Sequence, residues 1–107
     1  MTVIDIAPLA RAGPSAPTTI RLHGDIDIFT TKALRLRLLS ALRYSTSMLI
    51  LDMSDVSFCD ASGLGVLVGI RNRARAQGVT LALTGIRPSL TRILRITGLD
   101  RSLPIMM

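Results

Sequence analysis

Asp60, Ser62 and the glycines beside them form the segment whose residue types are best suited to chemistry. Asp60-Ala61-Ser62-Gly63-Leu64-Gly65 follows one apolar run and leads into another that begins at Leu64. Aspartate is a preferred N-cap residue, so Asp60 is expected to begin a helix and to place Ser62 in its first turn. A hydroxyl at that position, flanked by small residues, would be accessible to another protein. Ser62 is therefore the candidate reactive group.

Catalysis by Ser62 is not expected, because a nucleophilic serine needs a base within reach and an oxyanion hole. The sequence has a single histidine, His23, in an alternating segment that is typical of a solvent-facing strand. Gly63-Leu64-Gly65 lacks the lysine and the spacing of a phosphate-binding loop. The single cysteine, Cys59, excludes an internal disulfide and provides no metal cluster. The sequence therefore predicts neither an enzyme nor a metal or cofactor site.

The composition is basic and aliphatic. The net charge is +6, while 49% of the residues are hydrophobic and only 3% are aromatic. Because the arginines are dispersed and few aromatics are available for stacking, we expect no direct binding of nucleic acid, and an acidic protein partner suits the charge equally well. Apolar runs stay far short of the ~20 residues that cross a bilayer, and the N-terminus does not resemble a signal peptide. These features predict a cytoplasmic protein without membrane insertion.

The elements that must position Ser62 can be placed from periodicity and from helix start and stop signals. The apolar segment Met48-Leu-Ile-Leu-Asp-Met53 is typical of a strand buried on both faces, followed by a small polar loop. The helix that starts at Asp60 should end near Gln77, with Gly78 in the left-handed conformation. Before the central strand we expect an edge strand over Val3–Leu9 antiparallel to a strand over Thr18–His23, a turn over Gly24–Asp27, and a helix from Thr30 or Thr31 to Tyr44. After the second helix we expect a strand over Val79–Thr84, a helix from Pro88 to Gly98, and a short strand over Leu103–Met106. The last helix should carry an apolar row of Leu90, Ile93, Leu94 and Ile96.

This order, β-β-α-β-α-β-α-β, predicts a single α/β domain over residues 1–107. Alternation of strands and helices implies right-handed crossovers between parallel strands. We therefore expect a small, mostly parallel sheet with helices packed against it.

The string Asp60-Ala61-Ser62-Gly63-Leu64-Gly65 after a buried strand resembles the signature of the STAS domain, the fold of anti-sigma factor antagonists. The element order of nearly the whole chain is similar too. In that family the serine at the position of Ser62 is phosphorylated by a partner anti-sigma kinase. Gly24-Asp25-Ile26-Asp27 also resembles a family segment, which implies that Asp25 and Asp27 lie near Ser62 on the partner surface.

The resemblance implies an anti-sigma factor antagonist. Such a protein would bind a serine-kinase anti-sigma factor, release the sigma factor, and be switched off by phosphorylation of Ser62. The partner-binding residues that it implies are Asp25, Asp27, Asp60, Gly63, Leu64 and Gly65. Two alternatives stay open at this point: a STAS-type regulatory subunit of a lipid-trafficking ABC transporter, and an interaction module without phosphorylation.

The glycines of the predicted second helix have two interpretations. Gly63, Gly65 and Gly69 each cost about 1 kcal/mol relative to alanine in an exposed helix interior. Close approach of the backbone to another surface would explain them. That surface could be the sheet or a docked partner.

Overall fold

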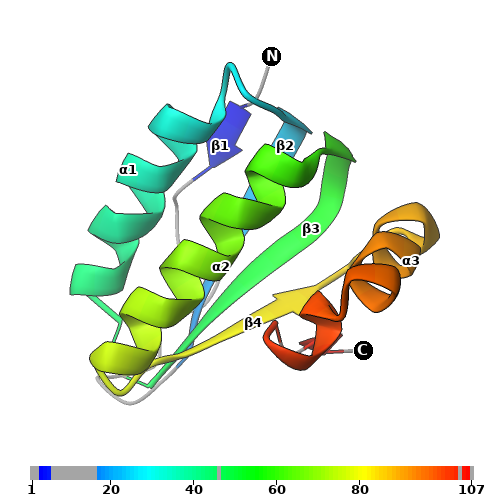
Figure 1. Ribbon diagram of the computed structural model, residues 1–107. Helices are drawn as coiled ribbons and strands as arrows, with labels where there is room; N and C mark the ends of the chain where they lie inside the picture. The colour runs from blue at the N-terminus through cyan, green and yellow to red at the C-terminus, as the bar shows by residue number, and fades with distance from the viewer. Residues whose placement is uncertain (1–2, 6–16, 46, 104, 107) are drawn as a thin grey trace.

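The computed structural model describes residues 3–5, 17–45, 47–103 and 105–106. Along the chain it contains strands, helices and one short 3₁₀ helix, η1, and the strand and helix order is the predicted one (Figure 1). The elements are β1 (Val3–Asp5), β2 (Thr18–Ile26), α1 (Thr31–Arg43), β3 (Met48–Cys59), α2 (Ala61–Ala76), β4 (Thr80–Thr84), α3 (Pro88–Thr97), η1 (Leu99–Arg101) and β5 (Ile105–Met106).

The described strands form one sheet in the order β1-β2-β3-β4-β5. β1 pairs with β2 antiparallel, as predicted, and the part of the expected first strand beyond Asp5 lies outside the described residues. β2, β3, β4 and β5 run parallel to one another. α1 and α2 lie side by side across one face of the sheet, whereas α3 lies beside the far end of β3 (Figure 1). The predicted α/β class and mostly parallel sheet are confirmed.

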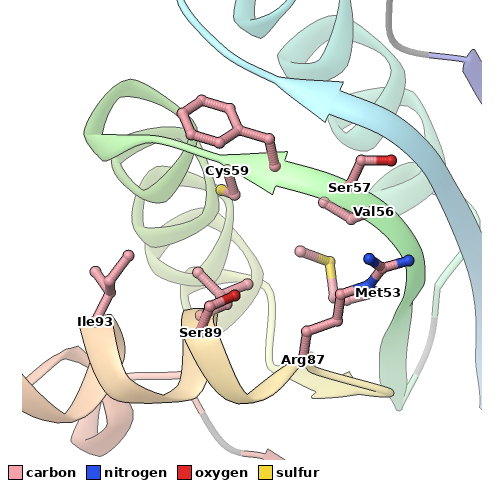
Figure 2. Close-up of a pocket in the computed structure, with 9 residues that line it drawn as sticks. Met53, Val56, Ser57, Cys59, Arg87, Ser89 and Ile93 are labelled. Carbon is pink, nitrogen blue, oxygen red and sulfur yellow. The ribbon is translucent and has the colours of Figure 1, made fainter.

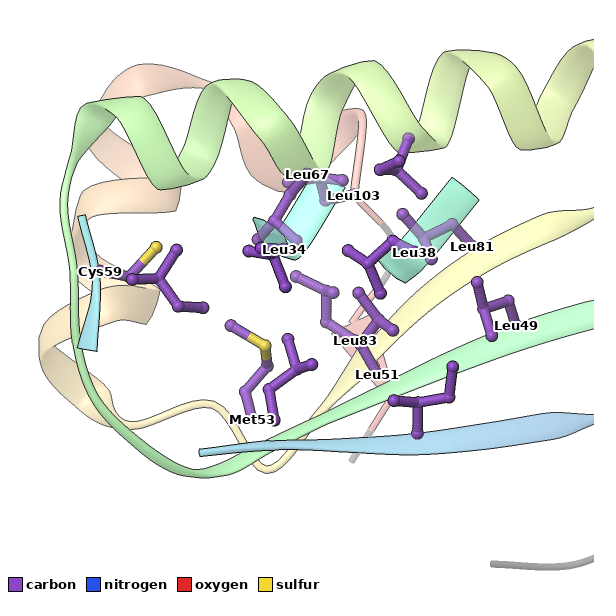
Figure 3. Packing of buried hydrophobic residues seen from close by; sticks show 14 of the residues in the cluster. Leu34, Leu38, Leu49, Leu51, Met53, Cys59, Leu67, Leu81, Leu83 and Leu103 are labelled. Carbon is purple, nitrogen blue, oxygen red and sulfur yellow. The ribbon is translucent and has the colours of Figure 1, made fainter. Parts of the chain in front are cut away.

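The core is aliphatic, as the low aromatic content predicts. Side chains of the central strands β3 and β4 meet the inner faces of α1 and α2 (Figure 3). Leu34, Leu38, Leu51, Leu67 and Leu83 are all 0% exposed. Burial of each such leucine contributes about 1.5–3 kcal/mol, so this cluster supplies the main stabilisation of the frame that carries Ser62.

The prediction of a polar loop after Met53 was wrong, because β3 continues to Cys59 and β2 continues beside it to Ile26. The pairing register shifts twice, between Arg21 and His23 and between Gly24 and Asp25 on β2. Each shift adds one residue to β3, so its buried residues Met53, Val56 and Cys59 are three apart instead of two. Simple alternation was therefore absent from the sequence, and most of the predicted Gly24–Asp27 turn is strand.

The helix ends follow the predicted signals. Gly78 and Gly98 both have φ of +77°, in the left-handed region that glycine adopts at helix C-termini. Pro88 occupies the first turn of α3. Only half of the apolar row predicted for α3 is buried: Leu90 and Leu94 face the core, but Ile93 and Ile96 are 40% and 77% exposed. The short η1 helix was not predicted.

Candidate functional site

Ser62 lies in the first turn of α2, directly beyond the end of β3. Asp60 has extended backbone angles (φ −95°, ψ −174°), and its carboxylate accepts the backbone N–H of Gly63 at 3.1 Å. This is the side-chain contact of an N-cap, so the predicted role of Asp60 is confirmed. The helix begins at Ala61 because Asp60 satisfies one of its free N–H groups. Ser62 is thereby held at the exposed N-terminus of α2.

The hydroxyl of Ser62 donates a hydrogen bond to Oδ1 of Asp60 across 2.5 Å. This bond, and next the N–H of Gly63, lower the pKa of the Asp60 carboxyl despite the opposing effect of partial burial. Asp60 is therefore ionised at neutral pH. The site therefore presents a partly exposed hydroxyl that is oriented by an ionised carboxylate.

The end of β2 lies beside this helix start. Ile26 pairs with Cys59, and the backbone N–H of Asp60 donates to the carbonyl of Ile26 at 3.1 Å. Asp25 pairs with Phe58 on the same two strands. Asp25 and Asp27 thus flank the residue that is bonded to Asp60. The ladder between β2 and β3 brings the two segments together, although Asp27 and Ser62 are 35 positions apart in the sequence.

Asp27 shapes the turn that joins β2 to α1. Its Oδ1 accepts the backbone N–H of Phe29 at 2.9 Å, and its own N–H donates to the hydroxyl of Thr30 at 2.9 Å. The first of these bonds is that of an Asx turn, and the second ties the start of the turn to Thr30. Ile28 and Phe29, at the tip of this turn, are 70% and 91% exposed. The Ile28 N–H also contributes to the lowered pKa of Asp60, which links the turn to the Ser62 segment.

Ile28 and Phe29 were missed by the sequence reasoning. Two bulky apolar residues that directly follow Asp27, within a segment with turn character, were the available signal. Large exposed apolar side chains that gather on one surface mark interaction sites. We refer to Ile28, Phe29, Asp60, Ser62 and Gly65 as the Ser62 surface.

The glycines of α2 divide into two kinds. A Cβ on Gly63 would lie 2.6 Å from Cγ2 of Ile26 and 2.8 Å from Sγ of Cys59, so this glycine packs against the sheet. Leu64 is also buried, at 4% exposed. A Cβ on Gly65 or Gly69 would meet nothing within 4 Å. Of the residues implied for partner binding, Gly63 and Leu64 therefore support the site from within, and Gly65 lies open at the surface.

The only histidine of the sequence is distant from Ser62 along the strand. His23 lies within β2, and its Nδ1 is 3.4 Å from Oδ2 of Asp55, which is five residues before Asp60. Within the described segments, no group of three or more histidine, cysteine, aspartate or glutamate side chains could hold a metal ion. No helix within them is long and apolar enough to cross a membrane.

Sequence comparison connects this site with a known family. The profile of the STAS domain matches residues 8–107. An anti-sigma F factor antagonist of Paenibacillus polymyxa is 30% identical over 87 residues, which cover 80% of this chain and 74% of that protein. An anti-sigma-B factor antagonist of Bacillus subtilis is 34% identical over 80 residues, which cover 75% of this chain and 72% of that protein.

Solved structures share the fold. An anti-sigma factor antagonist from Mycobacterium paratuberculosis superposes with a TM-score of 0.76 at 22% identity, covering 98% of this chain and 83% of that one. The Bacillus cell fate determinant SpoIIAA, solved in its phosphorylated form, gives a TM-score of 0.68 at 18% identity, covering 100% of this chain and 92% of that one.

The chain belongs to the STAS domain family. Its relatives described above are anti-sigma factor antagonists, which confirms the resemblance inferred from the Asp60–Gly65 string.

Proposed function

We propose that this protein is an anti-sigma factor antagonist whose Ser62 surface binds a serine-kinase anti-sigma factor. Phosphorylation of Ser62 by that partner ends the interaction. The observation that carries the proposal is the hydroxyl of Ser62, oriented by Asp60 at the exposed start of α2 and linked through Asp60 to the apolar turn at Ile28 and Phe29. The similarity to anti-sigma factor antagonists supports the choice of partner.

The energetics of the switch follow from the bonds around Ser62. A phosphate adds about −1.5 to −2 charges at pH 7 and replaces the hydroxyl donor by acceptor oxygens. Asp60 would lose the hydrogen bond that Ser62 donates and would face a second negative charge. The N-terminus of α2 favours an anion, so the domain itself should remain folded. The unfavourable free energy would therefore fall on a complex that fits a neutral hydroxyl beside apolar side chains.

The experiment is a phosphorylation and binding assay with the cognate anti-sigma factor, identified by co-purification and mass spectrometry. With ATP, the wild-type protein should gain one phosphate, on Ser62. Ser62→Ala should resist modification and still bind, because a methyl group replaces only a small hydroxyl. Ser62→Asp should bind more weakly than wild type, and the phosphorylated protein more weakly still, since aspartate carries one charge and fewer acceptor oxygens.

Ser57→Ala is the matched control, because Ser57 is an exposed serine on β3 that is not part of the Ser62 surface. It should be phosphorylated and bound like the wild-type protein. Equal affinity of the partner for the unmodified, phosphorylated and Ser62→Asp proteins would contradict the switch. A phosphate on Ser57, with Ser62 unmodified, would show that Ser62 is not the phosphorylated residue. Equal affinity would favour an interaction module without a phosphorylation cycle, as in the transporter-subunit alternative, whereas a phosphate on Ser57 would keep a phosphorylation cycle but remove Ser62 from it.

A further inference from the structure

A crevice between the second half of β3 and the start of α3 is separate from the Ser62 surface (Figure 2). β4 pairs with β3 only as far as Asp52, so beyond that point α3 flanks β3 on this side. A cavity of about 170 Å³ lies between this part of β3 and α3. Its apolar walls include Met53, Val56 and Leu90, which are buried, and Ile93, which is 40% exposed.

The volume limits what the crevice can hold. A dry cavity of about 150 Å³ lined by aliphatic and aromatic side chains binds one benzene molecule. Pockets for drug-sized ligands are larger, at about 300–1,000 Å³. The apolar part of an occupant is therefore one aromatic ring or a short alkyl chain. A nucleotide is too large for the crevice to enclose.

The charge of the lining selects the other part of the occupant. Arg87 lines the crevice at the start of α3, and Figure 2 shows its side chain extending toward β3. Its guanidinium makes one long hydrogen bond, 3.5 Å from the carbonyl oxygen of Ser54. Among the described residues no carboxylate lies within ion-pair distance of Arg87. The ion-paired acids of β3, Asp52 and Asp55, contact Arg21 and His23 of β2 instead.

The polar lining is completed by two serines, Ser57 and Ser89, and by no acidic residue. Arg87, which is exposed to solvent, is thus the charged side chain at the rim of a small, largely apolar crevice, and no carboxylate of the described residues pairs with it. Guanidinium groups recognise carboxylates through paired, charge-assisted hydrogen bonds. A neutral or cationic apolar molecule of the same size would leave this charge unpaired.

We propose that the crevice binds a compact apolar carboxylate, a small aryl or short alkyl acid, as a free molecule. Its apolar group lies between Val56, Leu90 and Ile93, and its carboxylate pairs with Arg87. This site does not depend on the proposed function of Ser62, and its test requires neither the kinase nor a phosphate.

The test is a titration of the protein with phenylacetate, with phenylacetamide as its neutral counterpart and phenethylamine as its cationic one. Backbone amide spectra locate the site. Phenylacetate should bind with a dissociation constant on the order of 1 mM, as expected for about ten non-hydrogen atoms. Its binding should shift the backbone amide signals of Val56, Leu90 and Ile93. The amide should bind about tenfold more weakly and the amine more weakly still, since hydrogen bonds to charged groups are the strong ones.

Two exposed arginines of the α3 segment provide a matched pair. Arg87→Gln should weaken phenylacetate binding about tenfold and remove the preference over the amide. Arg92→Gln removes an exposed charge from α3 that does not line the crevice, and it should bind like wild type. Ser89→Trp, at an exposed position of the rim, should fill the cavity and abolish binding while the far-ultraviolet spectrum stays unchanged.

The proposal would be overturned by several outcomes. These are no shifts at saturating phenylacetate, shifts confined to residues outside the crevice, equal affinity for acid and amide, or equal loss in the Arg87 and Arg92 variants. None of them bears on phosphorylation of Ser62, so failure here leaves the proposed function to its own assay.

Discussion

Oδ1 of Asp60 accepts the hydroxyl of Ser62 at 2.5 Å and the backbone N–H of Gly63 at 3.1 Å. One carboxylate oxygen therefore both begins α2 and orients the hydroxyl on it. A change at Ser62 should consequently alter the hydrogen bonding and the pKa of Asp60, the N-cap of the helix that carries Ser62. This coupling can be measured on the isolated protein, without any partner.

Removing the Ser62 hydroxyl should raise the pKa of Asp60. The hydrogen bond from Ser62 is the largest cause of the lowered pKa, so Ser62→Ala leaves only the backbone donors to stabilise the ionised form. A carbon-13 NMR titration of the aspartate carboxyl groups measures the shift. Ser57→Ala, which removes an exposed hydroxyl from β3, serves as the control and should leave the titration of Asp60 unchanged. An unaltered Asp60 pKa in Ser62→Ala would show that the hydroxyl does not donate to it in solution.

Gly63 and Gly65, two residues apart, should respond oppositely to alanine. A Cβ at Gly63 overlaps Ile26 and Cys59, so Gly63→Ala should reduce the free energy of unfolding by about 1–3 kcal/mol through overpacking. Gly65 has open space around it, so Gly65→Ala should increase the free energy of unfolding, by up to about 1 kcal/mol. Chemical denaturation measures both. A loss of similar size at Gly65 would mean that its neighbourhood is more crowded than the structure shows.

Bulk at Gly65 should separate folding from binding. Gly65→Arg should melt near the wild-type temperature, because the position is exposed, and should prevent binding of the anti-sigma factor by occupying the Ser62 surface. Calorimetry and a pull-down measure the two properties. Retained binding would remove Gly65 from the contact surface, whereas a collapsed melting temperature would assign it to packing.

Much of the fold followed from local signals in the sequence. Asp60, Pro88, Gly78 and Gly98 act within one turn of chain, so their effects on helix ends could be predicted. The extension of β3 to Cys59 could not, because two register shifts against β2 replace alternation with a spacing of three. The same limit applies to the site. Ser62 and Asp60 are neighbours in sequence, but the exposure of Phe29 and the packing of Gly63 on Ile26 depend on how β2 and β3 end together.

Acid should destabilise the protein partly through Asp52. Desolvation raises the pKa of its carboxyl, but the hydroxyl and N–H of Ser54 and the nearby Arg21 lower it by more. A carboxyl with a depressed folded-state pKa adds stability above its unfolded pKa of about 3.9, and that stability is lost as the pH falls through the folded value. Asp52→Asn should therefore unfold at lower denaturant concentration than wild type at pH 7, and the difference should shrink in acid.

Asp100→Asn is the comparison, since Asp100 takes part in no ion pair with any described residue. It should leave the midpoint of denaturation nearly unchanged at both pH values. A constant gap between wild type and Asp52→Asn from neutral to acidic pH would contradict the role of its ionised form.

Phe29 should contribute to partner binding without contributing to stability. Its side chain is 91% exposed at the tip of a turn held by Asp27, so it buries little surface in the free protein. Phe29→Ala should change the free energy of unfolding by less than about 0.5 kcal/mol. If the ring is buried against the anti-sigma factor, the same change should weaken binding about tenfold, as the loss of an aromatic residue at the centre of an interface does.

Tyr44→Ala is the matched control, because this 74% exposed aromatic lies at the opposite end of α1, about 20 Å away. Titration calorimetry of the three proteins should show loss of affinity for Phe29→Ala alone. Equal affinity of all three would remove the turn from the interface, and weaker binding by Tyr44→Ala alone would place the partner at the other end of the helix.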